Sequence, residues 1–310
     1  MINSVGNYTL MQSLHALSFA PDARNWLMSS RHPRILHVFD HACNLVNERG
    51  EVLSIVTPQI GNGPFNLVVN DKVLFLEYLT VESQVSVVGN QVTIGDLMIH
   101  TANAYLWNPR PDWEVLHAKK DGIFDQIKSM RTLIKAKQVL HQSKIASPQN
   151  ALLAMKFSPL PITNDQSLTS DLASALASAD ISSALTTTSQ LAGLGSGLTP
   201  AGDDFLLGAI YAAWIIHPPE VAKVLAEEIT NTAAPLTTSL SAAWLRSAGK
   251  GEGGILWHLF FDALITGSAP DIQLQITKLL SVGETSGADA LAGFVGVLLS
   301  WAVMAGSRIP

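Results

Sequence analysis

The residues best suited to chemistry lie in one glycine-rich stretch, GLGSGLTPAGDDFLLG, which runs from Gly193 to Gly208. Glycines at alternate positions let a backbone adopt positive φ and approach a ligand closely. Two adjacent carboxylates follow, where the pattern predicts the start of a helix. Free N–H groups at a helix start, together with the helix dipole, attract anions. We therefore predict an anion-binding loop at Gly195, Ser196, Gly197 and Leu198, with Thr199, Asp203 and Asp204 as candidate catalytic groups.

A structural alternative stays open, because tight turns between helices also use glycine, proline and capping aspartates. Two features favour function: a cap needs one acidic group where Asp203 and Asp204 supply two, and a turn does not need three alternating glycines. Adjacent carboxylates can orient an amide, accept a proton or hold Mg²⁺. Neither a Walker A loop nor a dinucleotide fingerprint fits the stretch. Ser196 resembles a nucleophile elbow but lacks a strand–turn–helix context and a paired Asp–His.

The same pattern recurs as GETSGADALAG at Gly283–Gly293. Each copy has Gly-x-Thr, small residues, aspartate and an apolar helix. Counted from the threonines, Asp203 matches Asp289; counted back from Gly208 and Gly293, Asp204 matches it instead. This second turn adds three candidate ligand-binding residues, Thr285, Ser286 and Asp289.

Basic and metal-ligating residues provide further candidates. Ser239, Arg246 and Lys250 fall close to one face of an expected helix and can bind a phosphate or carboxylate, although a solvated helix end explains them equally well. His37, Asp40, His41 and Cys43 suggest a metal, but this segment reads as strand and turn, and zinc would need a third ligand that cannot be placed. We therefore expect no metal site, with magnesium at the aspartate pair as the one option.

The elements that position these residues differ between the two parts of the chain. Residues 1–120 predict a β-rich domain that resembles a small barrel or sandwich, with one or two helices before it at Thr9–Ala20 and Asp22–Ser30. Residues 121–310 predict a helical domain, so the fold class is α+β. The expected strands of the first domain are 34–39, 43–48, 51–57, 65–69, 84–88, 91–95 and 97–100. The expected helices of the second domain are an amphipathic helix that starts at about residue 121, followed by 168–179, 181–192, 202–216, 219–231, 236–248, 253–266, 271–281 and 287–304.

Composition limits the class of protein. The net charge of −6 argues against a broad nucleic-acid-binding face, and 47% hydrophobic residues supply a packed core. The single cysteine fits a reducing compartment, and no signal peptide is evident. The apolar run at Ala290–Ala305 is shorter than a membrane span and predicts a buried helix. We expect a soluble, cytoplasmic protein without a membrane partner.

Three segments in this order and spacing resemble the AllH-type subunit family of oxamate carbamoyltransferase: GLGSGLTPAGDDFLLG, TTSLSAAWLRSAGKGE and GETSGADALAG. The N-terminal segment HVFDHACNLVNERGEVLSIV is a looser match, and the resemblance extends from about Arg34 to Ala305. The family pattern favours Pro where this chain has Ser196 and Ser where it has Ala201; neither change removes a charged group.

The resemblance implies a transferase subunit of anaerobic allantoin (purine) degradation that acts with carbamoyl phosphate and oxamate or a related amide or ureido acceptor. It implies partner subunits, one of them similar to acyl-CoA synthetases. Carbamoyl phosphate is a small dianion, which a glycine loop at a helix start suits. Two alternatives remain: a structural or regulatory subunit whose glycine loop docks partners, and a metal-dependent hydrolase that uses the aspartate pair.

Overall fold

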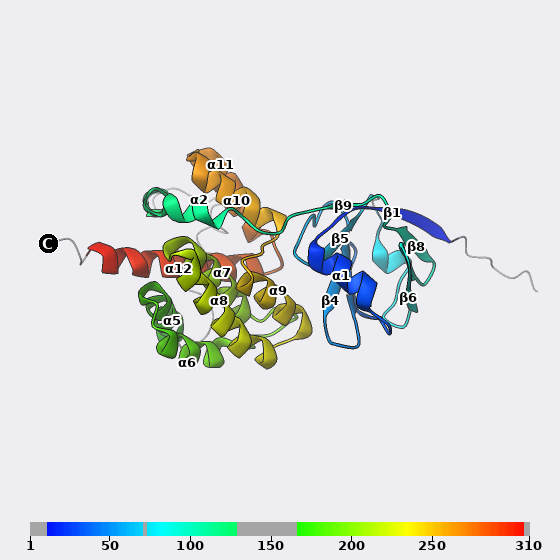
Figure 1. Cartoon of the computed structure of the whole chain (residues 1–310), viewed down its shortest axis with the longest axis horizontal. Helices are drawn as coiled ribbons and strands as arrows, with labels where there is room; N and C mark the ends of the chain where they lie inside the picture. Colours follow the sequence, from blue (N-terminus) through cyan, green and yellow to red (C-terminus); the bar gives the residue numbers. More distant parts are fainter. Residues whose placement is uncertain (1–10, 71–72, 129–165, 307–310) are drawn as a thin grey trace, which may run out of the picture. The chain divides into compact units, whose positions relative to one another are not determined.

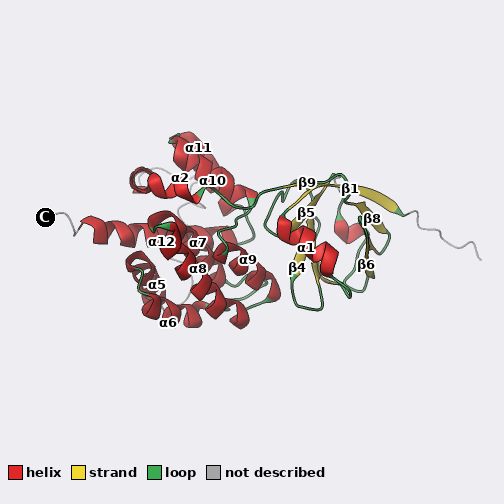
Figure 2. Cartoon of the chain, viewed as in Figure 1, coloured by secondary structure: helices red, strands yellow, loops and turns green. Residues whose placement is uncertain are grey.

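The computed structural model describes residues 11–70, 73–128 and 166–306. It consists of two compact units, Met1–Pro109 and Arg110–Pro310, each with its own hydrophobic core (Figure 1). Among the described residues, strands are found in the first unit and helices dominate the second (Figure 2), which confirms the α+β class. Helix α2 (Trp113–Ala118) precedes the expected boundary at residue 120, yet its residues Trp113 and Leu116 lie in the core of the helical unit.

The N-terminal unit is one nearly closed, barrel-like sheet with the strand order β2-β3-β4-β5-β1-β8-β7-β6, and β9 also pairs with β1. Strand β1 joins the two halves, because Gln12–His15 pairs with β8 whereas Ala16–Phe19 pairs with β5, with a register shift between Ala16 and Ser18. Such an irregularity lets a strand bend from one set of partners to another. The strands are β1 (Gln12–Phe19), β2 (Arg34–Val38), β3 (Ala42–Val46), β4 (Val52–Val56), β5 (Asn66–Val69), β6 (Val85–Val88), β7 (Gln91–Ile94), β8 (Leu97–His100) and β9 (Tyr105–Leu106).

The predicted helix at Thr9–Ala20 is wrong, because Gln12–Phe19 is strand β1. Its burial alternates with a period of two: Leu14, Ala16 and Ser18 are buried between exposed neighbours. That period belongs to a half-buried strand. The predicted helix at Asp22–Ser30 is confirmed as α1 (Pro21–Ser29), which has proline in its first turn, and a short 3-10 helix, η1 (Phe75–Glu77), follows strand β5.

Every helix predicted after residue 166 is present. They are α5 (Gln166–Ser178), α6 (Ile181–Leu191), α7 (Ala201–Ile216), α8 (Pro219–Ala233), α9 (Ser239–Gly249), α10 (Ile255–Thr266), α11 (Ala269–Leu280) and α12 (Ser286–Gly306), with a 3-10 helix, η2 (Ala234–Leu236), before α9. Residues 120–128 are also helical and bury Ile123 and Ile127, as the predicted amphipathic helix requires. The rest of that helix and the expected linker at Ser147–Asp165 lie outside the described residues.

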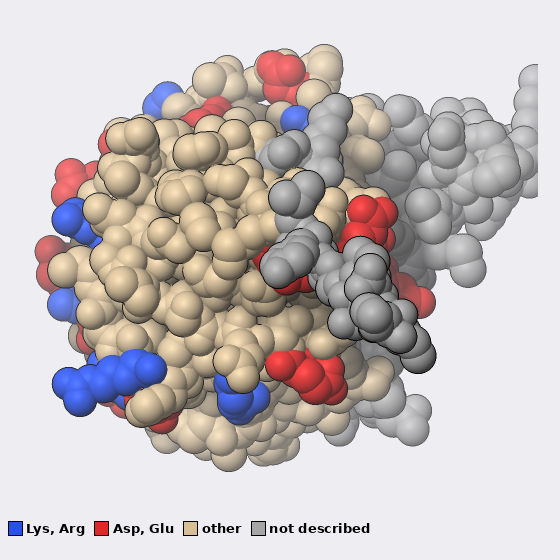
Figure 3. Space-filling model, turned by 90° about the vertical axis from the view of Figure 1, so that its right-hand side faces the viewer, with Lys and Arg blue, Asp and Glu red and all other residues tan. Residues whose placement is uncertain are grey.

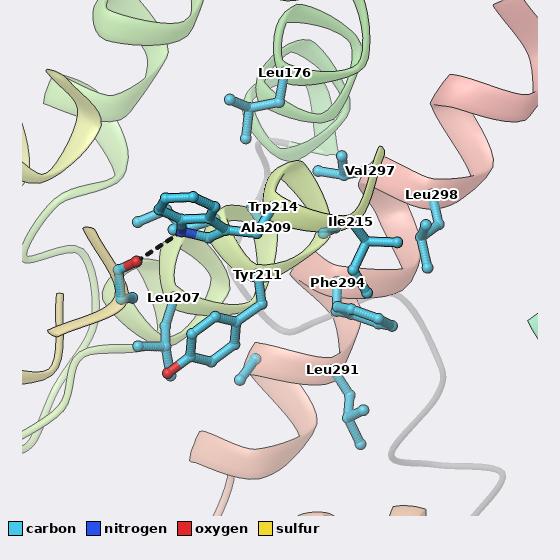
Figure 4. Close-up of a cluster of buried hydrophobic side chains, with 14 of the residues drawn as sticks. Leu176, Leu207, Ala209, Tyr211, Trp214, Ile215, Leu291, Phe294, Val297 and Leu298 are labelled. Carbon is cyan, nitrogen blue, oxygen red and sulfur yellow. Dashed lines mark hydrogen bonds between the residues drawn. The ribbon is translucent and has the colours of Figure 1, made fainter. Parts of the chain in front are cut away.

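Helix α7 is the centre of the helical unit, since all of its residues from Gly202 to Ile216 are buried. Figure 4 shows its side chains beside those of α12 and Leu176 of α5, with the Trp214 indole N–H donating to the Ala248 carbonyl at 3.0 Å. Glycines allow α7 and α12 to cross in close contact. A Cβ at Gly208 would lie 1.7 Å from the Ala290 carbonyl oxygen, and one at Gly293 would lie 2.0 Å from that of Phe205.

Helix α12 is, among the described helices, the one long and apolar enough to cross a membrane by length and composition. It packs against α7 and α5 within the helical unit, and its buried residues run from Gly287 to Leu298, so the predicted core helix is confirmed for that part; residues 299–306 are half-buried or exposed. In the face drawn in Figure 3, Lys and Arg side chains are scattered and form no continuous basic surface.

Candidate functional site

The glycine loop between α6 and α7 adopts the backbone conformations that its sequence predicts. Gly193, Gly195 and Gly197 have φ values of 72°, 118° and 96°. A Cβ at Gly193 would lie 2.5 Å from the Leu236 carbonyl oxygen, and one at Gly195 would lie 2.8 Å from the Ala201 nitrogen. The first two glycines therefore permit close contacts of the loop with its surroundings, whereas Gly197 faces open space.

Asp203 fastens this loop to the start of α9. Its carboxylate accepts hydrogen bonds from the Gly193 N–H at 2.8 Å, the Ser241 hydroxyl at 2.8 Å and the Thr237 hydroxyl. The Thr238 hydroxyl donates to the Leu198 carbonyl at 2.6 Å from the same end of α9. Because Asp203 is 1% exposed and both its oxygens already have donors, the geometry favours a positioning role over the expected catalytic one.

Most of the free donors of the site lie in the loop before α7. The Gly202 N–H donates to Leu194, and the N–H groups of Asp203 and Asp204 donate to Pro200, so most of the helix-start donors are occupied. Within the described residues, the N–H groups of residues 195–199 donate to no protein acceptor. Residues 195–197 are also exposed. Successive N–H groups in a loop of this kind form an anion-binding concavity.

The two Gly-Thr-Asp turns meet in the structure. The Thr199 and Ser286 hydroxyl oxygens are 2.9 Å apart, and both side chains hydrogen-bond to Asp204. The register counted back from the helix glycines is the one that the contacts support, because Gly208 and Gly293 make reciprocal contacts across the α7–α12 crossing. The two starts also match in their hydrogen bonds: Asp204 donates its N–H to the Pro200 carbonyl, and Asp289 donates its own to the Thr285 carbonyl.

Burial changes the acidity of both matched carboxyl groups. Burial raises the pKa of Asp204 to about 7; the hydrogen bonds from Ser286 and Thr199 oppose this rise, and the charges of Asp289 and Asp203 add to it. Burial also raises the pKa of Asp289 to about 6, opposed by a hydrogen bond from Thr285. Asp204 is 8% exposed and Asp289 is 2% exposed. In the described part of the chain, the Oδ2 atom of each lacks a hydrogen-bond partner. Such groups can exchange protons near neutral pH.

The basic candidates of α9 lie away from this cluster. Ser239 is exposed in the first turn of α9, beside the residues that bind Asp203. Arg246 belongs to the last turn and Lys250 caps the helix, so both lie at the opposite end of α9. The Lys250 carbonyl accepts a hydrogen bond from the Arg110 guanidinium at 2.5 Å.

The structure gives no support to the metal alternatives. Among the described residues, no group of three or more His, Cys, Asp or Glu side chains is placed to hold a metal ion. Cys43 is completely buried, and burial raises the pKa of its thiol to about 12. Asp203 and Asp204 do not present two free carboxylates to magnesium, because both oxygens of Asp203 accept hydrogen bonds from protein donors.

The residues that anchor the loop, Thr237, Thr238 and Ser241, are not among those predicted from the sequence. The signal was present as the run Thr-Thr-Ser-Leu-Ser, in which Thr238 caps α9 by accepting from the Ser241 N–H at 3.1 Å. Hydroxyl residues at such positions satisfy helix-start donors. The same run also binds the Asp203 carboxylate of α7. This contact is tertiary, so the run of residues alone does not predict it.

Comparison with known protein families matches both units. Residues 191–298 match the model of the oxamate carbamoyltransferase subunit AllH, and residues 15–106 match the N-terminal domain of the AllH family. The first match includes both turns, Asp203, Asp204 and Asp289. No solved structure matches the chain. Together the two matches cover more than half of the chain, which therefore belongs to the AllH family of oxamate carbamoyltransferase subunits.

Proposed function

We propose that this chain is the subunit that binds carbamoyl phosphate or phosphate in an oxamate carbamoyltransferase complex, with the phosphate held by the loop at residues 195–199. The observation that carries the proposal is the run of loop N–H groups at residues 195–199, which have no protein acceptor within the described residues and of which the first three belong to exposed residues. Hydrogen-bond donors fixed before a ligand arrives stabilise charge without further reorganisation. Asp203 holds the loop in place by accepting a hydrogen bond from the Gly193 N–H.

The neighbouring carboxyl groups suit carbamoyl transfer. When a nitrogen attacks carbamoyl phosphate, a C–N bond forms, the C–O bond to phosphate breaks, and the nitrogen loses a proton. A base with a pKa near neutrality serves this step best. Asp204, whose pKa burial raises to about 7, meets that requirement, and Thr199 and Ser286 connect it to the loop.

The remaining parts of the proposal extend the family assignment. Oxamate or a related amide or ureido compound is the acceptor, and the reaction belongs to purine (allantoin) nitrogen catabolism in the cytoplasm. The chain works with other carbamoyltransferase subunits, including one similar to acyl-CoA synthetases. The description of the matched family as a subunit supports a complex of several chains.

Calorimetry with carbamoyl phosphate and with phosphate tests the loop directly. Gly197→Ala introduces a side chain where φ is 96° and space is open, so the loop must change its backbone. We expect its affinity to fall at least ~10-fold. Gly50→Ala is the matched control, because Gly50 also has positive φ and open space but lies in the N-terminal unit. Absence of binding to the wild type, alone and with its partner subunits, overturns the proposal.

A scaffold role is the second candidate, in which the loop docks a partner subunit. Two exposed apolar side chains favour it: Leu236, whose carbonyl oxygen would lie 2.5 Å from a Cβ at Gly193, is 51% exposed, and Val282, directly before the second turn, is 41% exposed. Co-purification separates the two functions. If Gly197→Ala loses its partners but retains carbamoyl phosphate, the scaffold role is correct.

A further inference from the structure

Asp204 and Asp289 occupy equivalent positions in two related helix starts. The same spacing relates Gly202, Asp204 and Gly208 of α7 to their counterparts Gly287, Asp289 and Gly293 of α12. Gly202 and Gly287 also share a packing role. A Cβ at Gly202 would lie 2.0 Å from the Leu191 carbonyl oxygen at the end of α6, and a Cβ at Gly287 would lie 1.7 Å from the Leu279 carbonyl oxygen in the last turn of α11. The two carboxyl groups thus enter the α7–α12 crossing from matched places on its two helices.

Each of these carboxyl groups has one oxygen that nothing in the described chain satisfies. Both Oδ2 atoms are buried and have no hydrogen-bond partner, although the residues are 8% and 2% exposed. An ionised oxygen in such a place is costly unless a donor reaches it. When two carboxyl groups lie near each other and one of them keeps its proton, only one negative charge is buried.

We propose that Asp204 and Asp289 hold one proton between them and work as a single acid–base pair, which exchanges that proton with the ligand through Thr199 and Ser286. The exchange with ligand rests on the proposed function; the sharing of a proton does not. The charged group besides Asp289 that acts on Asp204 is Asp203, from the same helix. The other neighbours that bond to the pair are the hydroxyls of Thr199, Thr285 and Ser286.

The hydroxyl groups give the pair a route to the loop. Thr199 and Ser286 are half-buried and 2.9 Å apart, and both hydrogen-bond to Asp204. When the nitrogen attacks, its proton passes to a hydroxyl while that hydroxyl passes its own proton to the carboxylate of the pair. The C–N bond forms, and phosphate leaves with the electron pair of the broken C–O bond. The pair then returns the proton to the departing phosphate.

Carboxyl ¹³C NMR of the full-length protein, labelled at aspartate, tests the shared proton without ligand. We expect Asp204 to keep its proton to about pH 7 and Asp289 to about pH 6. Asp289→Asn removes the like charge and lowers the midpoint of Asp204 by about one pH unit. Asp262→Asn makes the same charge change at an exposed position on α10 and leaves that midpoint unchanged.

Two outcomes of that titration overturn the pair. One is that both Asp204 and Asp289 ionise below pH 5 in the wild-type protein; this measurement needs no variant. The other is an Asp204 midpoint that does not move in Asp289→Asn. If Asp289→Asn does not fold, Asp204→Asn provides the reciprocal measurement on the midpoint of Asp289.

Proton uptake tests the exchange with ligand. Calorimetry of carbamoyl phosphate binding at pH 6.5, in two buffers that differ in ionisation enthalpy, reports the protons taken up. We expect uptake of a fraction of a proton by the wild type and none by Asp204→Asn. If the wild type binds carbamoyl phosphate without proton uptake, the proton exchange is overturned and anion binding is not. If the proposed function is wrong, the wild type does not bind carbamoyl phosphate at all, while the NMR midpoints of the two aspartates stay as expected.

Discussion

Asp203 and Asp204 are neighbours in the chain, but their carboxyl groups have different surroundings. Successive residues of a helix point about 100° apart, so the two side chains face different elements. Asp203 meets the start of α9 and accepts three hydrogen bonds, whereas Asp204 meets α12 and keeps one oxygen without a partner in the described chain. One aspartate therefore holds the loop, and the other is available for proton transfer.

Replacement of Asp203 tests its positioning role. Asp203→Asn keeps the shape but removes the charge and one acceptor from three donors, so we expect the free energy of unfolding to fall by about 2 to 3 kcal/mol. Urea denaturation followed by circular dichroism measures this loss. Asp262→Asn, at an exposed position of α10, should change stability by less than about 0.5 kcal/mol. Equal effects of the two substitutions would show that Asp203 fastens nothing.

Cys43 provides a second prediction at this scale. It is the one cysteine of the chain, it is completely buried, and burial raises the pKa of its thiol to about 12. Only the thiolate reacts with disulfide reagents. We expect no reaction with a chromogenic disulfide at pH 8 in the folded protein and one equivalent of reaction in urea. Rapid reaction of the native protein contradicts the burial of this residue.

At the scale of elements, the crossing of α7 and α12 brings the two turns together. Gly208 and Gly293 each face a carbonyl oxygen of the other helix, at distances where no Cβ fits. The crossing therefore depends on glycine on both helices. It also places Ser286 beside Thr199, which connects the two halves of the site.

Two glycines of the same helix give a matched test of that crossing. Gly293→Ala places a Cβ 2.0 Å from the Phe205 carbonyl oxygen, so we expect α7 and α12 to separate at a cost of about 3 kcal/mol or more. Gly296→Ala meets its nearest atom at 3.8 Å, and alanine is the better helix former by about 1 kcal/mol. Thermal unfolding should show a lower midpoint for the first variant and an unchanged or higher one for the second. Similar midpoints would rule out the close crossing.

Elements with a strong local pattern could be predicted from the sequence, and contacts between elements could not. The helices α5 to α12 have apolar periodicity and clear start and stop signals, and the prediction found each of them. Strand β1 was missed because Leu17 on its exposed face, together with Met11 directly before the strand, obscures the period of two. The repeat in the sequence identified both turns, but it allowed two alignments, in which either Asp203 or Asp204 matches Asp289. Only the packing of Gly208 against Ala290 selects Asp204 as the partner of Asp289.

At the scale of the whole molecule, the site lowers the stability of the fold near neutral pH. Two carboxyl groups are buried where α7 crosses α12, and the unfolded chain would ionise both freely. Their burial is therefore a cost that grows as the pH rises. Buried His217 acts in the opposite direction, because burial lowers its pKa and the unfolded chain binds its proton more strongly.

A comparison of wild type with Asp204→Asn across pH reports the contribution of Asp204, together with its effect on the coupled Asp289. Its pKa is about 7 in the folded protein against a usual value of 3.8, so between these values the unfolded chain has lost a proton that the folded protein retains. The free energy of unfolding of the wild type thus falls as the pH rises through this range, by about 3 kcal/mol from this group. Asp204→Asn does not titrate, and His217 contributes equally to both proteins. We therefore expect the variant to gain stability relative to wild type between pH 4.5 and pH 7.5, as measured by urea denaturation at 222 nm, where the helical unit dominates. Parallel curves for the two proteins would mean that the pKa of Asp204 in the folded protein stays near its usual value, and a carboxylate of such low basicity would be a poor proton acceptor for the proposed transfer.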